Sequence, residues 1–199
     1  DHLTPALKQA IEKADKLQDV EDLYLPYKQK RRTKATIAKD AGLEPLAAWL
    51  LRFPASGIQE HAAQFVNEAQ DITDANTALA GAHEILAEAF GDNAGLRNWV
   101  RNYTRDRGLL VAKVKPKGKA ADEQGVYQQY YDFNSPIKQM VPYRVLAINR
   151  GEAEKVLKVS IDVDRAGIDR YCHFRFIGQH HGPAIELVEA AYQDAYKRF

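Results

Sequence analysis

Two stretches of the sequence hold cations that could bind the phosphates of a nucleic acid. The first runs from Lys28 to Lys39 and holds six basic residues with no acidic one before Asp40, although the net charge of the whole chain is only +1. Contacts between such cations and phosphates are sensitive to salt and carry little sequence information. The residues of this basic arm that we expect to make them are Lys28, Lys30, Arg31, Arg32 and Lys34.

The second stretch is a predicted helix over residues 93–107. Its arginines Arg97, Arg101 and Arg105 recur at every fourth position, which places them on one face. Four lysines follow between positions 113 and 119, and three tyrosines come shortly after them. This mixture suits a single strand, which binds through backbone charge and base stacking. The alternative is that the arginines pair with glutamates of neighbouring helices and the tyrosines belong to the core.

Residues that could support catalysis or bind a metal do not form a recognisable pattern. Metal-ligand residue types occur at Cys172, His173, His180 and His181. They lack the C-x-x-C or H-x3–5-H spacing that fixes a tetrahedral zinc site. Asp162 and Asp164 could hold a divalent cation, but Lys158 and Ser160 share their strand face, which favours a solvated strand. We therefore predict no enzymatic activity, no metal and no cofactor.

The basic arm leads into a pair of short helices typical of a helix-turn-helix. Thr33 can cap a helix over 34–41, Gly42 can close it in the left-handed conformation, and Pro45 suits the first turn of the next helix, 45–51. Ile37, Ala48 and Leu51 are spaced to pack behind the turn. The second helix is almost wholly apolar, so we expect it to be buried and not to read base edges.

The remaining patterns predict a mainly α fold with one small β-hairpin. Helical periodicity predicts one helix over 5–24, others over 58–69 and 74–90, and a last helix from Gly182-Pro183 onward. Ser135-Pro136 and Pro142 are expected to start two more helices. Alternation of apolar and polar residues over 156–164, followed by an aromatic run over 171–177, predicts the hairpin near residues 156–177.

We expect two domains. Residues 1–26 and 135–199 would form a helical scaffold that includes the hairpin, and residues 27–134 would form the helical subdomain with the helix-turn-helix-like unit. The stretch over 114–125 is predicted to be a flexible loop because it is rich in Lys, Gly, Ala and Asp.

Composition narrows the class of protein. The chain has 199 residues, and its single cysteine excludes an internal disulfide and fits a reducing compartment. It has no apolar run near 18 residues, and no secretory signal is seen. We therefore expect a cytoplasmic protein with no membrane partner. With 28 basic and 27 acidic residues, any nucleic-acid binding must be confined to patches.

Several motifs resemble a known family. They are Leu23–Lys28, Lys30–Thr33 and Ile37–Ala47, followed in the same order by Tyr130–Pro136, Tyr143–Glu152 and Val156–Val159. Together they resemble the N-terminal region of the Tex family of bacterial transcription accessory proteins. The resemblance covers most of the chain.

The resemblance implies a role in transcription and an association with RNA or DNA. Tex proteins continue into a YqgF-like domain, a helix-hairpin-helix module and an OB-fold RNA-binding domain, whose motifs are not seen here. Since the chain also begins with Asp1, we expect a truncated piece of a longer protein.

Two functions remain open from the sequence. In the first, this region is a scaffold that binds RNA or DNA weakly and non-specifically through phosphate contacts, with the transcription machinery reached through the full-length protein. In the second, it is a protein-interaction or structural module that binds no nucleic acid of its own.

Overall fold

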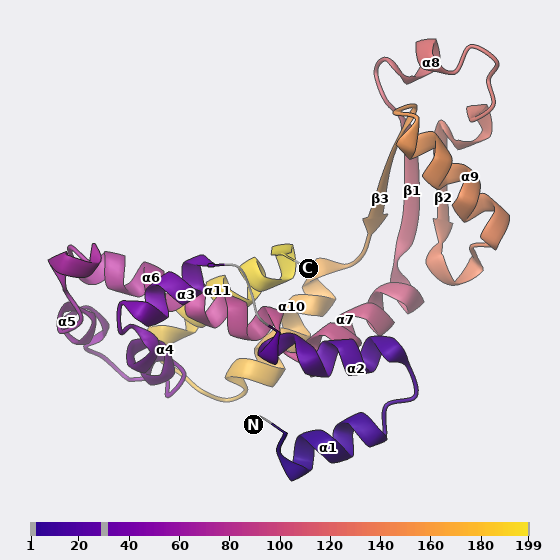
Figure 1. Ribbon diagram of the computed structural model, residues 1–199. Coiled ribbons are helices and arrows are strands. Elements are labelled where there is room, and N and C mark those ends of the chain that lie inside the picture. Colours follow the sequence, from indigo (N-terminus) through magenta and orange to yellow (C-terminus); the bar gives the residue numbers. More distant parts are fainter. Residues whose placement is uncertain (1–2, 29–31, 199) are drawn as a thin grey trace. The chain divides into compact units, whose positions relative to one another are not determined.

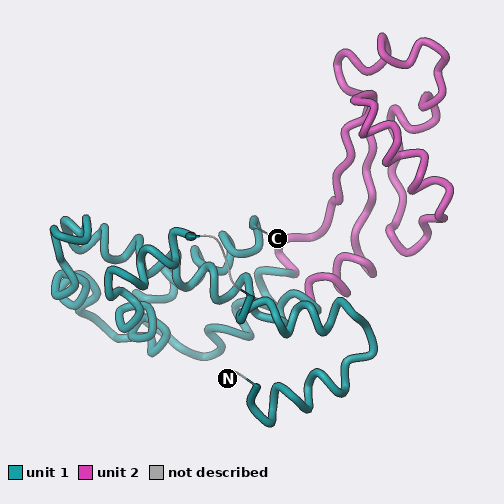
Figure 2. Tube along the Cα trace, in the orientation of Figure 1, with its two compact units in different colours: residues 1–98, 168–199 teal, residues 99–167 magenta. Residues whose placement is uncertain are grey.

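The chain forms two compact units in the computed structural model, which describes residues 3–28 and 32–198 (Figures 1 and 2). Unit 1 comprises residues 1–98 and 168–199, and unit 2 comprises residues 99–167. The division into domains 1–26 with 135–199 and 27–134 stays a prediction.

The regular elements of unit 1 are helices within the residues described, apart from an isolated antiparallel bridge between Asn67 and Ile72. The helices are α1 (Pro5–Glu12), α2 (Leu17–Tyr24), the 3-10 helix η1 (Leu25–Tyr27), α3 (Lys34–Asp40), α4 (Glu44–Leu50), α5 (Ile58–Ala63), the 3-10 helix η2 (Glu68–Gln70), α6 (Ala75–Gly91), the π-helix η5 (His173–Ile177) and α11 (Ala184–Arg198). Helices α7 (Ala94–Arg107) and α10 (Arg165–Cys172) each run across a boundary between the units.

Helix α6 is the centre of unit 1. It packs against α3, α4, α5 and α11 (Figure 1). Its apolar stripe, Leu79, Ala82, Leu86 and Phe90, is buried. Apolar positions three and four apart share a helix face, so one such stripe can serve several partner helices at once. Asp74 caps α6 by accepting a hydrogen bond from the Thr77 amide (2.7 Å).

Helices α3 and α4 meet at the tight turn that the sequence predicts. Thr33 caps α3 by accepting a hydrogen bond from the Thr36 amide (3.1 Å), and Gly42 is left-handed with φ of 79°. Leu43 follows and is fully buried, because Gly81 of α6 has no side chain at that point: a Cβ there would lie 2.2 Å from Leu43 Cδ1. The turn is therefore fixed by its fit against α6.

The packing residues of this turn differ from those predicted. Ile37 and Leu51 are exposed, as is Ala48, whereas the buried side of α4 consists of Leu46, Ala47 and Leu50. Spacing alone cannot select among the faces of a helix that is apolar all round, so the position of α6 decides it.

Two predicted helices of unit 1 are shorter than expected. Residues 5–24 form α1 and α2, separated at residues 13–16, instead of one helix. The break contains neither glycine nor proline, so the periodic pattern gave no signal of it. Helix α5 ends at Ala63 instead of continuing to 69.

Unit 2 is built on a three-stranded antiparallel sheet with strand order β2-β1-β3. The strands are β1 (Leu109–Val114), β2 (Asp132–Pro136) and β3 (Leu157–Asp162). Between and around them lie α8 (Gly118–Ala121), the 3-10 helices η3 (Gln128–Tyr130) and η4 (Ile137–Gln139), and α9 (Pro142–Ala153). Ser135-Pro136 therefore ends strand β2, and only the three-residue 3-10 helix η4 follows it, whereas Pro142 begins α9 as predicted.

The mainly α class with a small β element is confirmed, but the partner of the predicted strand is corrected. Tyr171 and Cys172 end α10, and residues 173–177 form the π-helix η5, so this stretch is not a strand. Strand β3 pairs instead with β1, about fifty positions earlier in the chain. Aromatic and apolar runs of this length fit a buried helix as well as a strand, and only tertiary pairing distinguishes them.

One face of the sheet is covered and the other is open. Leu110 and Ala112 of β1, with Leu157 and Val159 of β3, belong to a core shared with Ile148 of α9. Alternation then places Lys113 and Lys158, which are paired in register, on the opposite face. The open face is largely polar and exposed.

Among the helices of residues 3–28 and 32–198, none combines the length and apolar character needed to cross a membrane.

Candidate nucleic-acid interface

The part of the basic arm carried by α3 lies in unit 1, beside carboxylates of α6. Lys34 forms an ion pair with Glu84 (3.7 Å) and Lys39 forms one with Glu88 (3.9 Å). Lys28 and Arg32 are exposed, and Lys30 and Arg31 lie outside the described residues. The part of the arm carried by α3 is thus partly neutralised by its neighbours.

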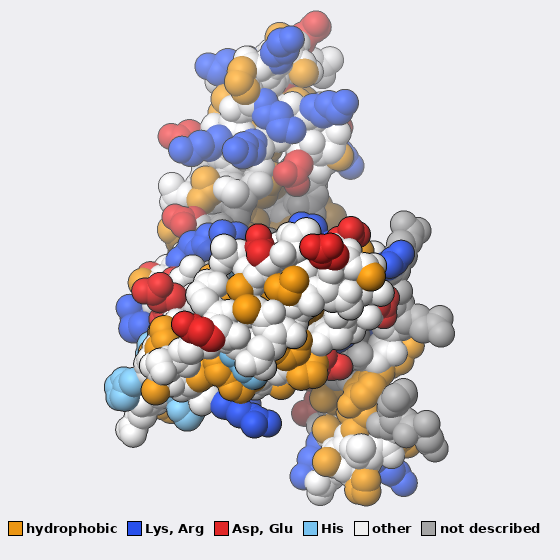
Figure 3. All heavy atoms as spheres, turned by 90° about the vertical axis from the view of Figure 1, so that its left-hand side faces the viewer, with side chains coloured by type: hydrophobic (Ala, Val, Ile, Leu, Met, Phe, Trp, Pro, Cys, Tyr) orange, Lys and Arg blue, Asp and Glu red, His pale blue; other side chains and the backbone are white. Residues whose placement is uncertain are grey.

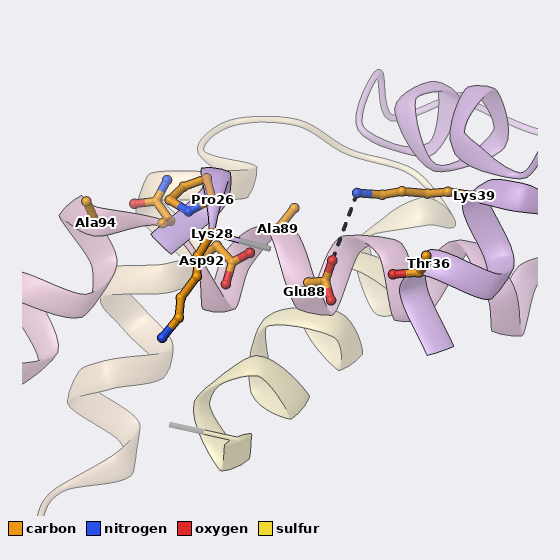
Figure 4. A pocket seen from close by; sticks show the side chains of 9 residues that line it. Pro26, Lys28, Thr36, Lys39, Glu88, Ala89, Asp92 and Ala94 are labelled. Atoms are coloured by element: carbon orange, nitrogen blue, oxygen red, sulfur yellow. Dashed lines mark ion pairs between the residues drawn. The ribbon is translucent and has the colours of Figure 1, made fainter. Parts of the chain in front are cut away.

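A cavity of about 570 Å³ lies between the arm and α6 (Figure 4). Lys28, Lys39, Glu88 and Asp92 are among its lining residues, and the Lys39–Glu88 ion pair spans part of it. A phosphate entering this cavity would meet carboxylates as well as ammonium groups, and like charges at close range repel. The cavity is therefore a poor site for a polyanion.

Arg97 is anchored within unit 1. Its guanidinium Nε lies 3.3 Å from Oδ1 of Asp22, whose side chain is only 4% exposed, and its Nη1 donates to the Gly91 carbonyl (3.0 Å). Because burying a carboxylate without a partner destabilises the folded state, we interpret Arg97 as a residue that stabilises unit 1.

The other two predicted arginines belong to unit 2. Arg101 is half-buried, and Arg105 is exposed and donates to the carboxylate of its neighbour Asp106 (3.1 Å). This hydrogen bond keeps the pKa of Asp106 below its ordinary value. The predicted set is therefore divided between the units, and its assignment to nucleic acid stays a prediction.

The charge of the chain is divided unequally, which the overall balance conceals. Residues 99–167 hold 13 Lys and Arg against 8 Asp and Glu, whereas the rest of the chain holds 15 against 19. Unit 2 thus has a net charge of +5 and unit 1 one of −4. On the face of unit 2 that Figure 3 presents in its upper part, Lys and Arg side chains gather.

The lysine-rich stretch after β1 is folded, in contrast to the flexible loop predicted over 114–125. Asp122 is buried and accepts hydrogen bonds from the amides of Val126 (2.7 Å) and Tyr127 (2.8 Å) and from the hydroxyl of Tyr131 (2.9 Å). Burial acts to raise the pKa of Asp122, but these hydrogen bonds outweigh it and lower the pKa below its ordinary value. A composition rich in Lys and Gly cannot reveal such a hydrogen-bond network. The only hint in the sequence is a single aspartate, Asp122, close to Tyr127 and Tyr131.

Three of the residues considered for catalysis or metal binding, Asp164, His173 and His180, have other partners. Asp164 accepts from the amides of Ala166 (3.0 Å) and Gly167 (3.2 Å) at the start of α10. His173 pairs with Glu189 (3.1 Å), and His180 stacks on Phe53 with ring centroids 4.5 Å apart. Within the described residues, no group of three or more His, Cys, Asp or Glu side chains could hold a metal ion.

Cys172 is buried, with 1% of its surface exposed. Desolvation, with a smaller effect of Asp169, raises the pKa of its thiol to about 12. A thiol with so high a pKa is protonated near neutral pH and is a poor nucleophile.

Residues 54–192 match a family model described as Tex central region-like. The chain belongs to the Tex family, as the sequence motifs predict. The matched model describes the central region, whereas the motifs led us to expect the N-terminal region.

Individual relatives agree with the family. The chain is 42% identical over 201 residues to uncharacterized protein YdcI of Bacillus subtilis. The aligned region covers 100% of this chain and 28% of that protein. The chain is 43% identical over 162 residues to protein tex of Bordetella pertussis, covering 81% of this chain and 20% of the relative. A more distant relative is the human S1 RNA-binding domain-containing protein 1, at 25% over 177 residues, with 86% and 18% covered. The chain thus spans less than a third of the length of these relatives.

Proposed function

We propose that this chain belongs to a transcription- or RNA-associated protein, in which it is a helical scaffold that binds nucleic acid weakly and non-specifically. The relatives support the association, since one is named a transcriptional accessory protein and others are named for an S1 RNA-binding domain. The observation that carries the binding proposal is the net charge of +5 on unit 2.

The proposed contacts go to phosphates and not to base edges. A recognition helix must present Arg, Lys, Asn or Gln to the groove, but α4 buries Leu46, Ala47 and Leu50 against unit 1. Binding through lysines and arginines alone is independent of sequence and weakens as salt rises. The chain would therefore contribute affinity and position to its parent protein, and little specificity.

The test is a fluorescence-anisotropy titration of single-stranded RNA against the 199-residue chain at low and at moderate salt. We expect binding at low salt, with the logarithm of the association constant falling by about 0.7 per bound phosphate for each unit of log salt. Absence of binding at low salt refutes the proposal. The charge-reversal variant K28E/K30E/R31E/R32E tests this part of the basic arm, and unchanged affinity removes these residues from the interface.

The second candidate function is a protein-interaction or structural module without nucleic-acid binding of its own. The ion pairs of Lys34, Lys39 and Arg97 with carboxylates favour it, because these cations already have partners in unit 1. It predicts no RNA binding at any salt concentration, so the same titration separates the two candidates.

Three further parts of the assignment are proposals. We place the protein in the cytoplasm, in agreement with its single buried cysteine. We assign this region no catalytic activity, and any contact with the transcription machinery is assigned to the longer protein.

A further inference from the structure

Five lysines of unit 2 gather where β1 ends and β3 begins. They are Lys113, Lys117, Lys119, Lys155 and Lys158, and we call them the lysine cluster. All five are exposed, and within the described chain none of them forms an ion pair. Resting on the function proposed above, we infer that this cluster is the site where the chain holds the phosphate backbone of a single-stranded nucleic acid.

The first observation is a pair of like charges on the open face of the sheet. Lys113 of β1 and Lys158 of β3 are direct partners in the register. Like charges directly opposite each other destabilise an antiparallel pair, since the side chains stand close together. Asp132 lies opposite Lys113 on β2, yet these two described residues do not form an ion pair. A bound phosphate between the two ammonium groups would relieve their repulsion.

The second observation is the backbone of Lys155. Its φ of 63° is left-handed, and it ends α9 in a Schellman motif in which the Val156 amide donates to Gly151 O and the Lys155 amide to Glu152 O, both at 3.0 Å. Glycine is the usual residue at this position because a Cβ is unfavourable there. A lysine held at a glycine position is a departure from local preference of the kind that accompanies function.

The third observation places the remaining two lysines beside the others. Gly118 lies between Lys117 and Lys119 and packs so closely on the start of β3 that a Cβ would lie 2.2 Å from the Val156 carbonyl oxygen. The same Cβ would lie 2.9 Å from Val114 Cγ2. This close approach holds the loop against the ends of both strands, next to Lys155 and Lys158. The hydrogen bonds to Asp122 fix the rest of the loop.

A linear polyanion fits these features better than a membrane does. A membrane-binding surface combines cations with exposed apolar side chains that enter the lipid. Most neighbours of the cluster on the open sheet face are polar, among them Asn134, Ser160 and Asp162. Val111 on this face is half-buried, and the exposed Leu109 lies at the opposite end of β1 from the cluster. The lysines lie on two β-strands, a loop and a helix end, so together they can contact successive phosphates of a flexible single-stranded nucleic acid. A single bound anion would not need such an extended set of cations.

The test compares two charge-reversal variants of the whole chain with equal changes in net charge. The site variant is K117E/K119E/K155E/K158E. The matched control, K8E/K13E/K16E/K197E, reverses four exposed lysines of unit 1. Folding of each is checked by circular dichroism and by its urea midpoint, and an all-glutamine version of the site variant replaces it if the reversal prevents folding. Each protein is titrated with single-stranded RNA, with single-stranded DNA of the same sequence and length, and with polyglutamate.

We expect the site variant to lose about tenfold or more in affinity for the RNA and the DNA. Its salt dependence should be shallower by about 0.7 for each phosphate that it no longer binds. The control should lose about threefold or less, which is the nonspecific effect of net charge. An equal loss of nucleic-acid affinity in both variants would refute the assignment of the lysine cluster as the binding site. Polyglutamate that binds as tightly as RNA would refute it as well. If the unaltered chain binds no RNA, the proposed function itself fails; if it binds and the site variant binds equally well, only the location is wrong.

Discussion

Replacing Arg97 by methionine should destabilise unit 1, because it removes the guanidinium that pairs with the buried carboxylate of Asp22. Removing one partner of a fully buried ion pair costs about 3–5 kcal/mol. The side chain of Arg97 is 30% exposed, so water reaches part of the pair and the expected cost falls to about 2–3 kcal/mol. Methionine retains most of the apolar volume, which keeps the change in packing small.

The measurement is urea unfolding followed by tryptophan fluorescence, with a double-mutant cycle of R97M and D22N. The double variant should be more stable than the sum of the single losses predicts, by about 1–2 kcal/mol, because the two groups interact directly. R105M is the control: its partner Asp106 is an exposed neighbour, so the urea midpoint should hardly move. A loss below about 0.5 kcal/mol for R97M would show that the pair does not anchor the fold. Arg97 would then return to the candidates for phosphate binding.

Three further predictions follow from local geometry. K155G should raise the unfolding free energy by about 1 kcal/mol, because glycine accepts the left-handed backbone, whereas K155A should not; a less stable K155G in urea titrations would refute the strain. For Asp194, desolvation is outweighed by hydrogen bonds from Arg198 and His83, so its folded pKa lies below the ordinary value of 3.8. A carboxyl group whose pKa is lower in the folded state stabilises the protein at pH values above its unfolded pKa, and this stabilisation is lost as the pH falls through the folded pKa. The difference in unfolding free energy between wild type and D194N should therefore shrink below about pH 4. A difference that does not change with pH would contradict this prediction. Cys172 should resist iodoacetamide in the native protein at about pH 7.5 and react in urea, and rapid native labelling would mean that it is not buried.

Local signals allowed much of unit 1 to be predicted. The capping Thr33, the left-handed Gly42 and the proline in the first turn of α4 are short-range features, and they predicted the α3–α4 turn correctly. The extent of α6 was predicted for the same reason, since helical periodicity over 74–90 is a local pattern and α6 spans Ala75–Gly91.

Long-range pairing could not be predicted in the same way. The partner of β3 is β1, and nothing in residues 109–114 or 157–162 specifies that pairing, whereas 171–177 is nearer and has a β-like composition. The break between α1 and α2 has no glycine or proline signal.

The sequence predicted the kind of residue at the candidate nucleic-acid site, lysines and arginines, but only part of where the fold places them. Counting cations along the chain identified both basic stretches, but it could not show that α6 supplies Glu84 and Glu88 to the first one. It also could not bring Lys155 and Lys158 to the end of β1, because about forty residues separate them from it. The left-handed backbone of Lys155 is a property of the folded chain that no sequence pattern announces.

Lysine footprinting tests most directly whether nucleic acid is held by unit 2. The chain would be acetylated briefly with and without a saturating single-stranded RNA at low salt, and each lysine quantified by mass spectrometry. We predict protection of Lys113, Lys117, Lys119, Lys155 and Lys158, with Lys34 and Lys39 changed little. Protection of the arm lysines while those five stay equally reactive would contradict the placement of nucleic acid on unit 2.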